Sequence, residues 1–312
     1  MSYFSKIQTY SSSGGNNQGL ISLTKLKKFK IPVIEMKKQE IFAKSLNNMI
    51  NIEEKFIAGI NEIKNEMQKY FKFNDFKNKD LVDFEIDGDL LKKSTIWNAN
   101  FFNPTWKKIK SKLKENFKIE KLSEHIDAFK GDEIGSDNYE IYTEKETKSL
   151  PFIRTSDIYN YQVDIFPDFY CNPQFKKVQE SKFENNDLII NNDGKIGYPS
   201  ILVNNEYIFQ SHIRSLKIKQ KSSLNQYYIF ACLISPFIGN VQFDKNTVIQ
   251  STIPTLSNRI YNFEIPIADK NFIKYISDEV IKNFNLLKDK KTILEEIVSN
   301  IDGEFNFKDY YN

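Results

Sequence analysis

Few residues of this chain have the types and spacing that metal binding or nucleophilic catalysis requires. Cys171 and Cys232 are isolated, with no CxxC motif and no cysteine or histidine at ligand spacing. The sequence therefore indicates neither a disulfide framework nor a zinc site, and we expect both cysteines to be reduced core residues. His125 belongs to no motif, and His212 is the only other histidine. No metal site is predicted.

One short string invites a catalytic interpretation. Asn103-Pro104-Thr105-Trp106 is similar to the Asn-Pro-Pro-aromatic motif of adenine methyltransferases, but the second proline is absent and no glycine-rich cofactor segment precedes it. The chain also lacks a glycine-rich phosphate loop and a GxSxG motif. We therefore predict no catalytic residue and no enzymatic activity in this chain.

Two long segments carry apolar residues at alternating steps of four and three, the pattern of a coiled-coil seam. The first segment starts at Phe42, is interrupted at Glu53, and contains Leu46, Met49, Phe56, Ile60, Ile63, Met67 and Tyr70. The second is interrupted at Lys291 and contains Val280, Phe284, Leu287, Leu294, Val298 and Ile301. A narrow apolar stripe in water needs another helix to cover it, so we predict that the two helices pair antiparallel.

The sequence between these helices favours strands. Residues 73–117 indicate a connector and a lead-in helix that begins near Pro104. From 118 to 267, short apolar runs alternate with turn residues, and Asn191-Asn192-Asp193-Gly194 is the strongest hairpin signal. The continuous apolar run Tyr227 to Ser235 is consistent with a buried helix. The predicted class is α+β: a β-rich domain with long helices that form an antiparallel coiled-coil-like pair.

The entries to the two long helices repeat each other. Leu26 to Val33 matches Ile260 to Ile267 at Phe29 and at Ile31-Pro32, an offset of 234 residues (263 minus 29). In both copies a strand that ends in Ile-Pro leads into a long helix. We therefore divide the chain into the tail of a first unit, a helix, a connector, a complete domain, a second helix and a tail, at 1–34, 35–72, 73–117, 118–267, 268–302 and 303–312.

Composition predicts a globular, cytoplasmic protein. Of the 312 residues 40% are hydrophobic, and no stretch has the roughly 18 to 20 apolar residues of a membrane span. The N-terminus is polar, unlike a signal peptide. The 44 basic and 41 acidic residues give a net charge of +3, which does not by itself indicate nucleic-acid binding.

Several local strings, in this order and spacing, resemble the specificity (S) subunit of type I restriction-modification systems. The resemblance extends from about Lys121 to Ile301, with a weaker echo over Gly19 to Tyr70. The strings are Lys130-Gly131-Asp132-Glu133-Ile134-Gly135-Ser136, Pro151-Phe152-Ile153-Arg154-Thr155-Ser156-Asp157-Ile158, Asp187-Leu188-Ile189-Ile190, Gly194-Lys195-Ile196-Gly197, Phe209-Gln210-Ser211-His212 and Ile249-Gln250-Ser251-Thr252-Ile253-Pro254-Thr255-Leu256.

The resemblance implies a non-catalytic DNA-reading subunit. In that family, target recognition domains alternate with two conserved helices, each domain reads half of a bipartite DNA site, and the helices dock methyltransferase (M) subunits. S-adenosylmethionine is then expected in the partner methyltransferase, and no cofactor in this chain. The family usually has two recognition domains, whereas only one is complete here. Two such halves forming a homodimer, a split-locus product, and the presence of a restriction (R) subunit stay open at this point.

The resemblance also implies which side chains contact double-stranded DNA. Phosphates favour lysine, arginine, hydroxyls and backbone amides, whereas base edges in the major groove favour forked arginine and glutamine side chains. The predicted DNA-binding residues are Lys130, Arg154, Thr155, Ser156, Lys195, Gln210, Ser211, His212, Arg214, Gln250, Ser251, Thr252 and Arg259.

Each of these residues also has a structural interpretation. Arg154 beside Asp157 fits an internal ion pair, and the Gln-Ser pairs at 210–211 and 250–251 fit side chains that satisfy strand ends. His212 fits a hydrogen-bonded structural residue. For the whole chain, the alternatives are a protein-interaction scaffold and a truncated or decoy subunit that occupies a methyltransferase without directing it.

Overall fold

The structure is a computed structural model, and its described residues end at 304. They are 27, 33, 35–73, 84–94, 96, 98–141, 149–165, 167–179, 181–204, 206–250 and 252–304. Nearly all of the tail predicted at 1–34, and with it the first copy of the repeat, lies outside these residues, as does the end of the tail predicted at 303–312.

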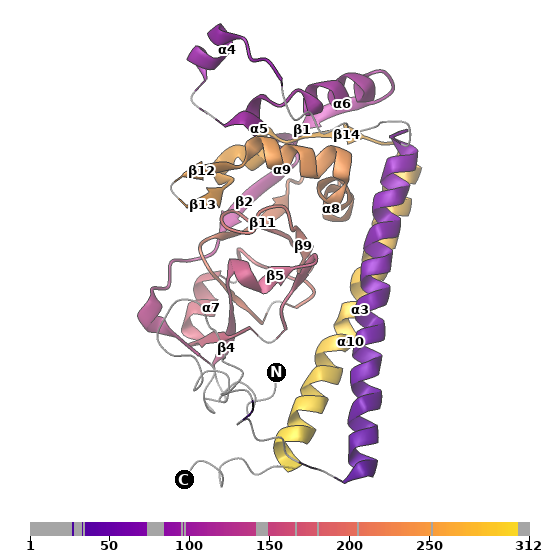
Figure 1. The fold of residues 1–312 in the computed structure, drawn as a ribbon, viewed down its shortest axis with the longest axis vertical. Coiled ribbons are helices and arrows are strands. Elements are labelled where there is room, and N and C mark those ends of the chain that lie inside the picture. The colour runs from indigo at the N-terminus through magenta and orange to yellow at the C-terminus, as the bar shows by residue number, and fades with distance from the viewer. Residues whose placement is uncertain are drawn as a thin grey trace.

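Two long helices stand beside the rest of the molecule, which we call the head (Figure 1). They are α3 (Met36–Tyr70) and α10 (Lys270–Glu304). The Tyr70 and Phe272 rings stack with centroids 3.7 Å apart, and Glu53 and Lys290 form an ion pair at 2.6 Å. Because residue numbers fall along α3 as they rise along α10, the helices are antiparallel. The predicted α+β class with an antiparallel helix pair is confirmed.

The helices cross closely at Gly59. A Cβ atom there would lie 2.2 Å from Asn283 Oδ1, and the buried Asn283 amide donates a hydrogen bond of 3.0 Å to the Phe56 carbonyl. The predicted seam is wrong at Leu46, which is 44% exposed. Met49, the next position of the predicted seam, is half-buried as expected, and Ser45 is half-buried in place of Leu46.

Three short helices follow α3 before the head begins. They are α4 (Gly88–Lys93), α5 (Ala99–Phe102) and α6 (Thr105–Lys114). Pro104 precedes α6 directly, as the sequence predicts. The indole of Trp106, on α6, donates a hydrogen bond of 3.0 Å to Glu264, so this connector packs on the strand that leads into α10.

The head contains two four-stranded sheets and three strand pairs among its described residues. The first sheet has the order β2-β11-β8-β9 and is antiparallel throughout; the second has the order β10-β4-β7-β3, with β10 and β4 parallel. The sheet strands are β2 (Ile126–Lys130), β3 (Tyr139–Ile141), β4 (Leu150–Ile153), β7 (Phe169–Cys171), β8 (Leu188–Asn191), β9 (Ser200–Ile201), β10 (Ile208–Phe209) and β11 (Ile213–Ile218). The pairs are β1 (Lys118–Lys121) with β14 (Glu264–Ile267), β5 (Ile158–Tyr159) with β6 (Gln162–Val163), and β12 (Val248–Gln250) with β13 (Ile253–Thr255).

Helical segments connect these strands. The α-helices are α7 (Gln174–Gln179), α8 (Gln226–Ile234) and α9 (Val241–Asn246), and the short turns are η1 (Leu122–Glu124), η2 (Ser136–Asn138), η3 (Thr155–Asp157), η4 (Pro236–Asn240) and η5 (Ser257–Asn262). Since β1 pairs with β14, the chain enters and leaves the head at one place, at the start of α10.

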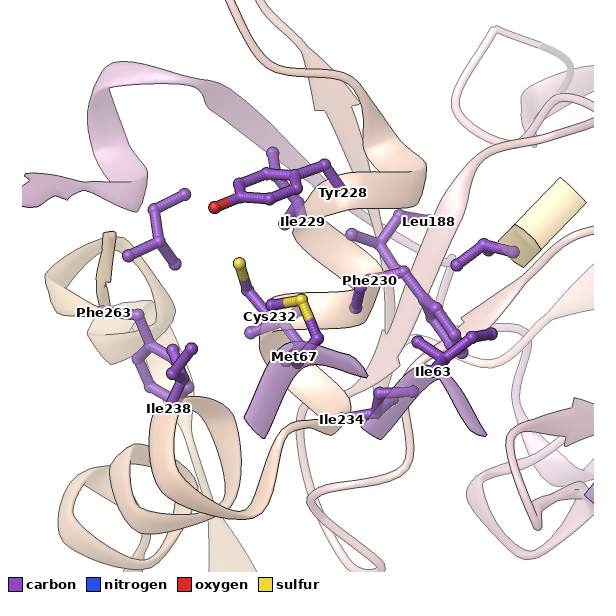
Figure 2. Close-up of a cluster of buried hydrophobic side chains, with 14 of the residues drawn as sticks. Ile63, Met67, Leu188, Tyr228, Ile229, Phe230, Cys232, Ile234, Ile238 and Phe263 are labelled. Atoms are coloured by element: carbon purple, nitrogen blue, oxygen red, sulfur yellow. The ribbon is translucent and has the colours of Figure 1, made fainter. Parts of the chain in front are cut away.

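The main core lies where the head meets the helix pair. Figure 2 shows Ile63 and Met67 of α3 beside residues of α8, with Leu188 of β8 close by. All α8 residues from Tyr228 to Ile234 are buried, which confirms the helix predicted from that apolar run. Burial of such side chains is the main favourable term in folding. The first sheet therefore has one face fixed against the helices.

Three polar side chains fasten the head to the middle of the helix pair; we call them the clasp. Lys290 Nζ lies 2.6 Å from Glu53 Oε2 and donates to Gln162 Oε1 at 3.1 Å. Gln162, which is buried, donates in turn to Glu53 Oε1 at 2.6 Å. Each member of the clasp thus has two partners.

Within the part of the chain that the structure describes, no helix is long and apolar enough to cross a lipid bilayer.

Candidate nucleic-acid interface

Strand register brings distant residues together at one end of the first sheet. Lys130, at the end of β2, is paired with Arg214 at the start of β11. Asn191, at the end of β8, is paired with Ile213. Because these strands are antiparallel, the loops that follow β2 and β8 and the turn that precedes β11 leave the same edge. We call this edge the sheet end.

The loop after β8 is wider than predicted. The hairpin predicted at Asn191-Asn192-Asp193-Gly194 is not a tight turn, because β9 pairs only as far as Ser200 and leaves residues 192–199 as a loop. The Asn191 amide donates two bonds of 2.9 Å, to the Lys195 and Thr155 carbonyls. The hydrogen bond from the Asn191 side chain to the Thr155 carbonyl replaces the local bonds that would close a tight turn. Gly194 has a φ of +77°, which glycine adopts readily.

Asp193 joins this loop to two other segments. Its Oδ2 lies 2.6 Å from His212 Nδ1, and its backbone forms a β-bridge with Thr255. Desolvation acts to raise the pKa of Asp193, but hydrogen bonds from Thr255, His212 and Asn192 outweigh it and hold the pKa below its ordinary value. The ionised carboxylate thus links the loop, the turn before β11 and strand β13.

Two predicted DNA-binding arginines bond their own chain. The Arg154 guanidinium lies 3.6 Å from Asp157 and 3.8 Å from Asp168, and stacks over the Phe169 ring at 4.0 Å. Arg259 donates to the carbonyls of Asn246 and Thr255, at 2.7 and 3.0 Å. These contacts fit the structural interpretation and position the turn at η3 and the end of β13.

Arg214 differs from both, because it is buried without an anionic partner. It is 3% exposed, and one nitrogen donates to Asn258 Oδ1 at 3.2 Å. Its Nε has no hydrogen-bond acceptor, and no carboxylate in the described ranges pairs with it. Burial lowers the pKa of Arg214, whereas nearby Tyr261 and Asp193 act to raise it. Arginine nevertheless stays protonated in proteins, so this is a desolvated positive charge.

Lys130 adds a second positive charge opposite the first. It is exposed, lies directly across the ladder from Arg214, and forms no ion pair with any residue the structure describes. Like charges directly opposite each other in antiparallel strands destabilise the pair. The sheet end therefore holds two adjacent cations that form no ion pair within the described ranges, and the nearest carboxylate, Asp193, acts on Arg214 only from a distance and is hydrogen-bonded to other groups.

The other predicted residues lie around this pair. Ser211 donates to Glu133 at 2.6 Å and Ser156 to Asp157 at 3.0 Å. Gln210 is half-buried, with its backbone bridged to Asp132. Lys195 and Thr252 are exposed. Gln250 ends β12, but its side chain, and all of Ser251, lie outside what is described.

Three of the seven buried side-chain polar atoms that have no hydrogen-bond partner among the described residues lie at the sheet end. Besides Arg214 Nε, the buried Oδ1 atoms of Asn191 and Asn192 have no donor among the described residues. Buried polar groups are normally hydrogen-bonded, and exceptions are common at functional sites. Sequence reasoning noted these asparagines only as turn residues and missed the role of Asp193. No group of three His, Cys, Asp or Glu side chains within the described ranges could hold a metal ion.

Comparison with known proteins gives matches among solved structures alone. No family model and no curated protein matches the chain. The HsdS subunit from Thermoanaerobacter tengcongensis is 14% identical, with a TM-score of 0.37, over 95% of this chain and 67% of that one. The type I restriction-modification S subunit from M. genitalium is 14% identical, with a TM-score of 0.41, over 95% and 66%. The type IIG restriction endonuclease BpuSI is 9% identical, with a TM-score of 0.39, over 64% and 33%. The S subunits are the class that the strings of this sequence resemble.

Proposed function

We propose that this chain is a non-catalytic DNA-reading specificity subunit that directs partner methyltransferase subunits to a DNA target. The observation that carries the proposal is the pair of cations at the sheet end, Lys130 and the buried Arg214, neither of which has an ion-pair partner among the described residues.

Two unpaired cations at adjacent positions lower the stability of the folded protein. An unpaired buried charge is destabilising by several kcal/mol, roughly 3–5 when a buried pair is broken. An apolar residue at the position of Arg214 would avoid this cost. A DNA phosphate bound by the exposed Lys130 would bring the missing negative charge next to the buried guanidinium of Arg214. Ligand binding therefore explains the pair where stability does not.

The other residues of the site divide by chemistry. Lys195 and the hydroxyls of Thr155, Ser156, Ser211 and Thr252 suit the phosphate backbone. Gln210, His212 and Gln250 suit base edges, which they would read in the major groove. Arg154 and Arg259, already bonded to their own chain, would act by holding their loops in place.

The helix pair is proposed to dock the methyltransferase. Ile41, Leu46 and Ile50 on α3 are 56%, 44% and 54% exposed, an apolar surface that favours a protein partner. S-adenosylmethionine would bind in the methyltransferase, and cleavage, if the system has it, would need a separate restriction subunit. We further propose a cytoplasmic location, and a homodimer of half subunits as the way to obtain two recognition domains.

Co-expression of the chain with a candidate methyltransferase subunit from the same genome, followed by mapping of adenine methylation in host DNA, tests this function. A discrete motif that appears only when the chain is present supports the proposal, and a palindromic motif supports the homodimer. Co-purification with an unchanged methylation pattern would favour the decoy alternative. If neither co-purification nor a new motif appears, the scaffold alternative gains support.

A further inference from the structure

We infer that the β12–β13 ribbon enters the DNA major groove and that Ile249 and Ile253 contact thymine methyl groups there. This inference rests on the proposed function and adds specificity-determining residues to it. The sequence predicts only polar residues of the ribbon, such as Gln250, as groups that read base edges.

The ribbon exposes one isoleucine on each face. Ile249 is paired with Pro254, and Gln250 with Ile253, so Ile249 and Ile253 point to opposite sides of the two-stranded ladder. Their exposed fractions are 64% and 58%. A ribbon that served only as a connection would have no need of two large apolar side chains in solvent.

The root of the ribbon is rigidly attached to the sheet end. Gly194 N donates to the Pro254 carbonyl at 2.9 Å, and Leu256 N donates to the Asn192 carbonyl at 2.7 Å. Leu256 is fully buried. In Figure 1 the ribbon lies on the side of the head away from the helix pair. Its orientation is thus set by the same loop that flanks Arg214.

This attachment indicates duplex DNA as the occupant. A duplex whose phosphate binds Lys130 and Arg214 would lie against the adjacent ribbon. The major groove admits a two-stranded ribbon and is about 8.5 Å deep. Ile253 is two residues beyond Thr255, a reach of roughly 7 Å at the rise of a β-strand. The thymine methyl is the apolar group that the groove offers to an isoleucine.

The test uses the full chain, in its methyltransferase complex where the two co-purify. The DNA target is first found by selection from a random duplex pool. Each thymine of the target is then replaced by deoxyuridine, which removes only the methyl group, and affinity is measured for wild type, I249T and I253T. Threonine keeps the β-branch that favours a strand. Leu90→Thr is the matched control, because Leu90 is 57% exposed but lies on α4, away from both the ribbon and the helix pair.

We expect wild type and L90T to lose about fourfold in affinity at one or more thymines, the factor for burying one methyl group. I249T or I253T should then bind thymine and deoxyuridine DNA equally at such a position. The inference is overturned if no replacement matters, or if the ribbon variants lose as much as wild type. Ribbon variants that change only self-association, measured by sedimentation, would assign the ribbon to a protein contact. If wild type shows no salt-dependent duplex binding, the proposed function itself fails.

Discussion

Charged side chains are arranged in opposite ways in the clasp and at the sheet end. In the clasp, Lys290 is 16% exposed and has Glu53 and Gln162 as partners. At the sheet end, Arg214 is more deeply buried and has only the neutral Asn258. The clasp joins the head to the helix pair, whereas the sheet end lies within the head, so the difference is local to each region.

The comparison separates charges that hold the protein together from charges that await a ligand. A paired charge in the interior is neutralised by a partner in its own chain, so its removal leaves that partner as an unpaired buried charge. Removing a buried charge that has no partner leaves no other charge unpaired. Its loss should therefore affect ligand binding and not the stability of the fold. The following predictions use this difference.

The largest expected effect is on DNA affinity. K130M/R214M should lower affinity for the target by about 100-fold, because two positive charges beside the phosphate backbone and their counterion release are lost. Its thermal midpoint should stay equal to wild type or rise, since methionine fills a similar volume without a buried charge. Calorimetry and a duplex titration check both parts. A lower thermal midpoint with unchanged DNA affinity would show that the cations of the sheet end stabilise the fold and do not bind DNA.

The clasp should respond in the opposite sense. K290M leaves the Glu53 carboxylate without its cation, and the free energy of unfolding should fall by about 1–3 kcal/mol, less than for a fully buried pair because both side chains are partly exposed. DNA affinity should not change. The control E53Q/K290M removes both charges and should recover part of the lost stability in chemical denaturation. No recovery would show that the pair is not coupled.

Asp193 provides a pH-dependent test at the sheet end. Since its pKa is lower in the folded protein, its carboxylate contributes stability above the unfolded pKa of about 4, and that contribution is lost as pH falls through the folded pKa. D193N should therefore lose about 1 kcal/mol near neutral pH. The difference in unfolding free energy between D193N and wild type should disappear at acidic pH. Unfolding curves at several pH values check this, and a gap independent of pH would contradict it.

The smallest effect is expected for Arg154, a cation directly before η3 that is already paired. R154K keeps the charge near Asp157 but loses the flat contact with Phe169, which is worth about 0.5–1 kcal/mol of stability. Target affinity should stay within about threefold of wild type. A loss as large as that of K130M/R214M would place Arg154 among the DNA contacts.

The parts of the fold that follow from local periodicity were predictable. The stepped seam led to the antiparallel α3 and α10, and the apolar run at 227–235 led to the buried α8. Both signals arise from neighbours along the chain. Leu46 was misplaced because Ser45, one position earlier, faces the half-buried side of the helix in its place.

The site was only partly predictable, because partnership depends on distant residues. Arg154, Arg214 and Arg259 are alike in the sequence, yet Arg154 meets a carboxylate, Arg259 meets carbonyls and Arg214 meets neither. The tight hairpin failed at Asn191 because its amide bonds to Thr155, 36 residues earlier. Such contacts appear only once the strands are in register.

The most direct test of the account measures how the affinity of R214M for duplex DNA depends on salt, beside wild type and K290M. The unpaired guanidinium is predicted to help neutralise one phosphate, so the slope of log affinity against log salt should be smaller by about one in R214M and unchanged in K290M. An R214M slope equal to that of wild type would contradict the claim that the cations of the sheet end bind DNA.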